Sequence, residues 1–129
     1  MAGIYLHIPF CKRRCIYCDF FSTTQGGQTD RYIQTLCKEL EQRKEYIEGE
    51  DIETIYLGGG TPSQLQEKHF EQIFSTLYIY YPVRPDAEIT LEANPDDLNK
   101  EYVTMLRHFP FNRLSMGIQT FNDTTLRLL

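Results

Sequence analysis

The 129-residue sequence lacks several features that would assign it quickly to a class of protein. Its 13 basic residues are outnumbered by 18 acidic ones, so it has no positive excess to attract nucleic acid or an anionic membrane surface. The apolar start, MAGIYLHIPF, has no leading basic residues and is interrupted by His7 and Pro9, which argues against a signal peptide or membrane span there. We therefore expect a cytoplasmic globular protein with an ordinary hydrophobic core.

Cysteine is scarce and unevenly distributed. Three of the four cysteines, Cys11, Cys15 and Cys18, lie in the segment CKRRCIYCDFF with the spacing C-x3-C-x2-C. In a reducing compartment such a cluster favours metal binding over a disulfide framework. Three thiolates can each bind one iron of a 4Fe-4S cluster and leave the fourth iron open. The alternative is zinc, which usually has four protein ligands and would need Cys37 or His7 as the fourth.

Short strand patterns alternate along the chain with longer helical patterns. Apolar residues at every second position predict strands at 4–8, 54–57, 88–93 and 113–118. Helices are predicted to begin near Thr29 or Asp30, at Ser63 with an S-x-x-Q capping box, and near Asn99. This order predicts an α/β fold of parallel strands joined by right-handed helical crossovers.

The predicted strands are apolar on one face and polar or small on the other. A doubly wound sheet has helices on both faces, so its strands should be apolar almost throughout. The pattern instead predicts the first part of a partial TIM-like barrel, with helices outside and a polar inner surface. Because the final residues, FNDTTLRLL, read as the start of a helix, we expect residues 1–129 to be the N-terminal portion of a longer barrel domain, without its further strands and a C-terminal domain.

Three further motifs follow the predicted strands at the same end as the cysteines. LGGGTPS, residues 57–63, is neither a Walker phosphate loop nor G-x-G-x-x-G; its glycines either expose backbone groups to a ligand or form a turn that needs positive φ. Glu92, in LEANP, and Gln119, in GIQTF, lie on the polar face. A carboxylate there needs a dedicated partner, either a ligand or a group inside the protein.

The sequence resembles the radical S-adenosylmethionine (SAM) superfamily. Within it, the chain is similar to the group that contains oxygen-independent coproporphyrinogen III oxidase and HemW-type haem chaperones. The resemblance extends over essentially the whole chain and rests on four segments that occur in order along it: IYLHIPFCKRRCIYCDF, YLGGGTPS, ITLEANPDDL and RLSMGIQTFND.

The resemblance implies a 4Fe-4S cluster on Cys11, Cys15 and Cys18, with SAM chelating the open iron. Electron transfer to the cluster would then cleave SAM to a 5'-deoxyadenosyl radical, and no catalytic side chain is assigned. The residues that would contact SAM are Tyr5, Tyr17, Gly59, Gly60, Thr61, Glu92 and Gln119.

One position separates the two branches of the group. The oxidase branch has a further cysteine where this chain has Phe20, so the resemblance favours a chaperone that binds haem and delivers it to haem-accepting proteins. The alternatives are an oxidoreductase that decarboxylates porphyrinogen propionates, and a zinc-binding scaffold. The basic run 12–14 attracts an acidic reductant such as a flavodoxin, stabilises an anionic cluster, or is simply solvated.

Overall fold

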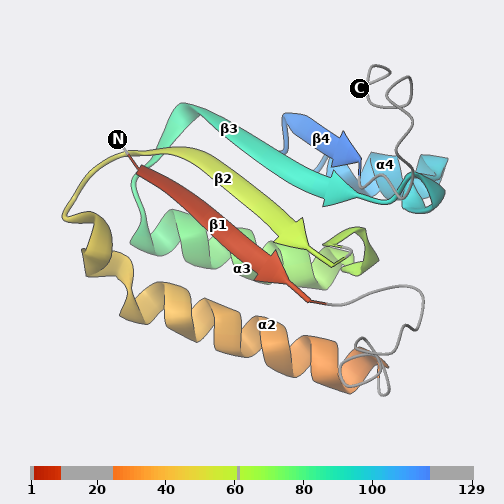
Figure 1. Ribbon diagram of the computed structural model, residues 1–129, viewed down its shortest axis with the longest axis horizontal. Coiled ribbons are helices and arrows are strands. Elements are labelled where there is room, and N and C mark those ends of the chain that lie inside the picture. Colours follow the sequence, from red (N-terminus) through yellow and green to blue (C-terminus); the bar gives the residue numbers. More distant parts are fainter. Residues whose placement is uncertain (1, 10–24, 61, 117–129) are drawn as a thin grey trace.

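The structure is a computed structural model that describes residues 2–9, 25–60 and 62–116 (Figure 1). Its strands form one parallel sheet in the order β1-β2-β3-β4. The strands are β1 (Ala2–Ile8), β2 (Ile52–Gly59), β3 (Val83–Ala93) and β4 (Arg113–Met116). The helices are α2 (Gln25–Gln42), α3 (Glu67–Tyr80) and α4 (Lys100–Leu106), with short 3-10 turns η1 (Lys44–Ile47), η2 (Pro62–Gln64) and η3 (Pro95–Asp97).

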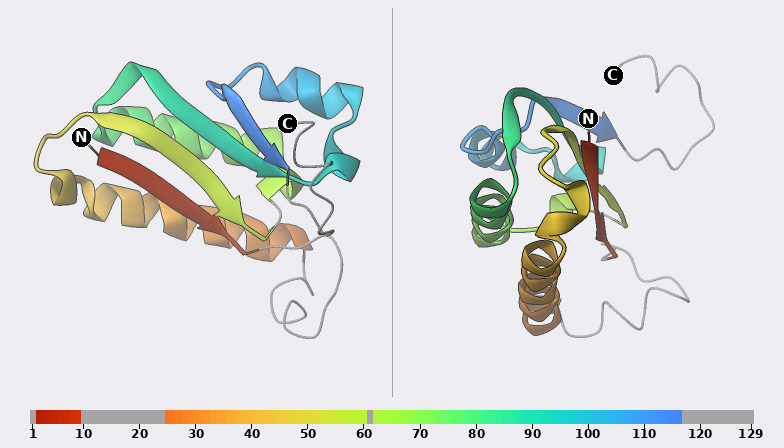
Figure 2. Two further views of the ribbon diagram at one scale, coloured as in Figure 1. Left: turned by 45° about the horizontal axis from the view of Figure 1, so that its top comes forward. Right: turned by 90° about the vertical axis from the view of Figure 1, so that its left-hand side faces the viewer.

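The described helices all lie on one side of the curved sheet (Figure 2). Strand and helix alternate along the chain, as the sequence predicted, and neighbouring strands are parallel. The predicted α/β fold, with helices outside the first strands of a barrel-like sheet, is therefore confirmed. No helix in the described ranges is long and apolar enough to span a membrane.

The register of the sheet explains why each strand is apolar on one face. Ile4 pairs with Ile55, which pairs with Ile89, and Leu6, Leu57 and Leu91 form the next such row. Parallel neighbours in register point to the same face, so these rows face the helices together. They pack against a buried helical layer that includes Ile33 and Leu40 of α2 and Phe70, Ile73 and Leu77 of α3.

The starts of two helices were predicted wrongly. α2 begins at Gln25, not near Thr29 or Asp30. Ser63 does not begin a helix: it lies in η2, and α3 begins at Glu67 behind a capping box made by Gln66 and His69. The reason is that the Ser63 hydroxyl is engaged by Asp97. On β4, Leu114 lies on the helix-facing side in register with Leu91, but it is 39% exposed because β4 is a short edge strand.

Candidate ligand-binding face of the sheet

The structure places four of the predicted SAM-contacting residues. Tyr5 lies on β1, Gly59 ends β2 with Gly60 directly after it, and Glu92 lies near the end of β3. Gly59, Gly60 and Glu92 lie at or near the C-terminal ends of neighbouring parallel strands, the end of the sheet at the right of Figure 1. Tyr5 lies at the middle of the adjacent strand β1. The other predicted site residues lie outside the described residues: Cys11, Cys15, Tyr17, Cys18, Thr61 and Gln119.

Two stacked tyrosines lie on this face of the sheet. Tyr5 and Tyr56 are register partners, and their rings stack with centroids 5.7 Å apart and an interplanar angle of 17°. The Tyr5 hydroxyl lies 3.3 Å from Nδ1 of His7, two residues along the same strand face. Tyr5 is 57% exposed, so its ring is available on the side opposite the helices. A flat, exposed aromatic surface of this kind suits stacking with a planar ligand group.

Glu92 is half-buried and bonded to a residue for which the sequence suggested no role. The Tyr56 hydroxyl donates to Oε2 of Glu92 at 2.7 Å. A hydrogen bond from Ser115 favours the Tyr56 phenolate, but burial and the Glu92 carboxylate together raise the pKa of Tyr56. Burial and then the charge of Glu92 likewise raise the pKa of Tyr5. Both phenols therefore stay protonated at neutral pH and can act as hydrogen-bond donors.

The glycines at the end of β2 pack closely against protein side chains. A Cβ on Gly58 would lie 2.5 Å from the Tyr56 ring, and a Cβ on Gly59 would lie 2.8 Å from the His7 ring. Gly59 also has φ +112°, which confirms the interpretation of the motif as a turn that needs positive φ. The Gly60 N–H donates to the Ile8 carbonyl at 2.7 Å, so the expectation of a bare N–H is wrong at Gly60.

A buried serine joins the glycine loop to the end of β3. The Ser63 hydroxyl donates to Oδ2 of Asp97 at 2.8 Å and accepts from the Asn94 N–H at 3.0 Å. The Asn94 side chain in turn accepts from the Asp96 N–H, as in an Asx turn. Asn-Pro in the sequence could have indicated that turn, but nothing local indicated that it would bind Ser63. The loop after β2, which includes Gly60, is therefore held against the loop that follows β3 and Glu92.

Cys37 is buried between helices α2 and α3. Its side chain is buried on α2, and its Sγ lies 3.6 Å from the Gln72 carbonyl of α3. Burial raises the pKa of its thiol, which keeps it protonated. This agrees with Cys37 as a buried apolar residue rather than a metal ligand. Within the described ranges, no group of three or more His, Cys, Asp and Glu side chains could hold a metal ion.

The polar and aromatic groups on this face suit a polar organic ligand. The half-buried carboxylate of Glu92 can accept hydrogen bonds from ammonium or hydroxyl groups, and the exposed ring of Tyr5 can stack with a planar ring. These groups fit the amino-acid and nucleoside parts of SAM. The thiolates that would hold a cluster are among the residues outside the described ranges.

Comparison with known proteins agrees with this geometry. The heme chaperone HemW of Lactococcus lactis is 40% identical over 124 residues, which are 95% of this chain and 32% of that protein. HemW of Escherichia coli is 36% identical over 129 residues, covering 98% of this chain and 34% of that protein. The chain thus spans about a third of the length of these relatives.

The solved structure of coproporphyrinogen III oxidase (HemN) from Escherichia coli, described as a radical SAM enzyme, superimposes with a TM-score of 0.80 at 34% identity. The match covers 98% of this chain and 30% of the oxidase. The family model described as the radical SAM superfamily matches residues 5–129. With its parallel sheet and one-sided helices, the chain belongs to the radical SAM superfamily.

Proposed function

We propose that this chain is the cluster- and SAM-binding part of a HemW-type haem chaperone, a protein that binds haem and delivers it to haem-accepting proteins. The observation that carries the proposal is the match of nearly the whole chain to proteins named heme chaperone HemW, at 40% identity in Lactococcus lactis and 38% in Bacillus subtilis. Phe20, where the oxidase branch has a further cysteine, supports the same choice.

In this proposal, Cys11, Cys15 and Cys18 hold the 4Fe-4S cluster. When bound together, cluster and SAM supply one-electron chemistry, which belongs to the cofactors rather than to the protein. Glu92 accepts hydrogen bonds from the ammonium or hydroxyl groups of SAM, and Tyr5 offers its exposed ring to a planar part of the ligand. Gly59 and Gly60 allow close approach of the ligand to the backbone.

The remaining contacts are proposed from the resemblance. Tyr17, Thr61 and Gln119 complete the SAM site, in segments adjacent to the described strands β1, β2 and β4. Haem, its acceptor proteins and an acidic one-electron donor such as a flavodoxin are the proposed partners. The basic run 12–14 within the cysteine segment is the proposed contact for that donor.

A second function is supported by the structural match to coproporphyrinogen III oxidase. In that case the same cofactors would serve a porphyrinogen dehydrogenase that removes carboxyl groups from propionates. The chaperone and the oxidase share the cluster and the SAM site, so the face described above fits both. They differ in what happens to the tetrapyrrole, which is bound and passed on in one case and chemically altered in the other.

One set of experiments separates these possibilities in the full-length protein that contains this chain. After anaerobic reconstitution with iron and sulfide, we expect the EPR signal of the reduced cluster to change when SAM is added. A triple Cys→Ala variant at positions 11, 15 and 18 should lose the cluster, whereas Cys37→Ala should keep it. Zinc retained without a reducible cluster would contradict the proposal.

The tetrapyrrole is tested next. We expect the reconstituted protein to bind haem, seen as a shifted Soret band, and to pass it to an apo haem protein. Incubation with coproporphyrinogen III, SAM and a reductant should leave the porphyrinogen unchanged. Formation of protoporphyrinogen would instead establish the oxidase function.

A further inference from the structure

Tyr56 is the partner of Glu92 on the candidate SAM-binding face. Its hydroxyl donates to one carboxylate oxygen, Oε2, at 2.7 Å. Glu92 is half-buried and has no cationic partner among the residues that the structure describes. A carboxylate in such a setting needs hydrogen bonds to remain charged, and Tyr56 supplies one from inside the protein.

The sheet itself directs Tyr56 toward Glu92. In the β2–β3 register Tyr56 faces Thr90, so Glu92 lies two residues farther along its strand on the same face. The Tyr56 ring therefore has to lean toward the end of the sheet to reach the carboxylate. Gly58 permits this, because a Cβ there would lie 2.5 Å from the ring.

The ring is also held from the side by β1. Tyr5 stacks on Tyr56 with an interplanar angle of 17°, and the two residues are direct register partners. Strand register, the missing side chain of Gly58 and the Tyr5 ring thus fix the Tyr56 hydroxyl before any ligand arrives. A binding group that is already ordered costs less conformational entropy when the ligand binds.

We propose that Tyr56 is a positioning residue for SAM: it holds the Glu92 carboxylate by Oε2 so that Oε1 is ready to accept a donor of the ligand. This inference rests on the proposed function, because it assumes that Glu92 contacts SAM. It predicts that the Tyr56 hydroxyl contributes to SAM affinity only through Glu92.

The test uses the full-length, anaerobically reconstituted holoprotein and measures the Kd of SAM from the EPR change of the reduced cluster. Tyr56→Phe keeps the ring and removes only the hydroxyl. We expect it to weaken SAM binding about tenfold, the lower end for loss of a hydrogen bond to a charged group. Iron content and the EPR signal without SAM should stay as in the wild type.

A double-mutant cycle separates positioning from a general structural effect. In the Glu92→Ala background the Tyr56 hydroxyl has no carboxylate to hold, so adding Tyr56→Phe should cause no further loss of affinity. Full additivity of the two losses would overturn the inference. Tyr81→Phe is the matched control: its hydroxyl donates to the Leu40 carbonyl at 2.7 Å on the helix side, so it should lower Tm and leave the Kd of SAM unchanged.

The outcomes also distinguish this inference from the function on which it rests. If the wild type forms its cluster but SAM changes neither the EPR signal nor the heat of mixing, both are wrong. If the wild type binds SAM and Tyr56→Phe binds it equally well, only the role of Tyr56 is wrong.

Discussion

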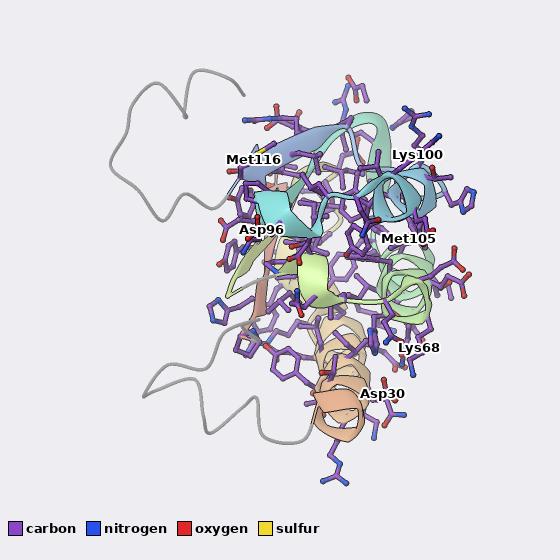
Figure 3. All side chains as sticks on the ribbon, turned by 90° about the vertical axis from the view of Figure 1, so that its right-hand side faces the viewer. Asp30, Lys68, Asp96, Lys100, Met105 and Met116 are labelled. Carbon is purple, nitrogen blue, oxygen red and sulfur yellow. The ribbon has the colours of Figure 1, made fainter. Side chains whose placement is uncertain are left out.

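Nε2 of His69 lies 2.6 Å from Oδ1 of Asp30, and this contact joins helices α2 and α3 near their N-terminal ends. Nδ1 of His69 accepts the Gln66 N–H at 3.0 Å, so it carries no proton, and Nε2 is the atom that donates to Asp30. Lys68 adds an ion pair to Asp30 at 3.2 Å, and Figure 3 shows the two labelled residues on neighbouring helices. The buried His69 thus has a hydrogen-bond partner on each of its ring nitrogens.

This arrangement predicts a pH-dependent contribution to stability. The hydrogen bond from His69, followed by that from Lys68, holds the pKa of Asp30 below its ordinary value of 3.8. A depressed pKa in the folded state stabilises the protein above the unfolded pKa, and this stabilisation is lost as the pH falls through the folded pKa. Asp30→Asn should therefore be less stable than the wild type at pH 7, and the difference should shrink below about pH 4.

Urea unfolding at pH 7 and at pH 3 measures this difference. Asp96→Asn is the control, because Asp96 is an exposed aspartate with no ion pair among the described residues. It should change stability little at either pH. If Asp30→Asn lost the same stability at pH 7 and at pH 3, the shape of the Asp30 side chain, rather than its charge, would make the contact important.

Ser63 is predicted to stabilise the loops at the candidate site. Ser63→Ala removes the acceptor of the Asn94 N–H and the donor to Asp97, at a position that is 3% exposed. A buried donor left without a partner costs about 1–3 kcal/mol, so the free energy of unfolding should fall by that amount. Thr104→Ala, which removes an exposed hydroxyl bonded within α4, should cost less than about 0.5 kcal/mol. Equal losses of the free energy of unfolding in the two variants, measured in urea, would contradict a stabilising role for the Ser63 hydroxyl.

The glycine loop offers a second comparison. Gly59 has φ +112°, and an added Cβ would lie 2.9 Å from the Ile8 carbonyl oxygen, a backbone atom that has little freedom to move. Gly49 also has positive φ, at +80°, but nothing lies within 4 Å of its Cβ position. Gly49→Ala should therefore cost about 1 kcal/mol for backbone strain alone. Gly59→Ala should cost clearly more, and a loss equal to that of Gly49→Ala would show that the loop simply moves away.

The sequence predicted the side of the sheet on which Glu92 lies, because alternation along a strand is a local property. It did not predict the partner of Glu92, since that depends on the β2–β3 register and on the lean of the Tyr56 ring over Gly58. The error at Ser63 has a related cause. S-x-x-Q satisfies a local capping rule, but Asp97, 34 residues away, bonds the same hydroxyl. Contacts made across the fold decide such cases, and one local pattern cannot show them.

Phe70 is predicted to be the most sensitive position of the aromatic core. It is fully buried, and its ring meets Phe111 edge-on at 5.4 Å and Phe109 at 5.6 Å. These two residues lie in the segment between α4 and β4, so Phe70 anchors the last described strand to α3. Phe70→Ala should lower the free energy of unfolding by about 3–5 kcal/mol, the usual cost of deleting a buried ring.

Phe70→Leu and Tyr78→Ala complete the test. Leucine fills part of the cavity, so Phe70→Leu should lower the free energy of unfolding less than Phe70→Ala does. Tyr78 is 49% exposed on the same helix, so Tyr78→Ala should lower the free energy of unfolding much less than either substitution of Phe70. Urea unfolding followed by circular dichroism gives the three values. If Phe70→Ala were no worse than Tyr78→Ala, α3 would not hold β4 through this ring, and the edge strand would depend on its pairing with β3 alone.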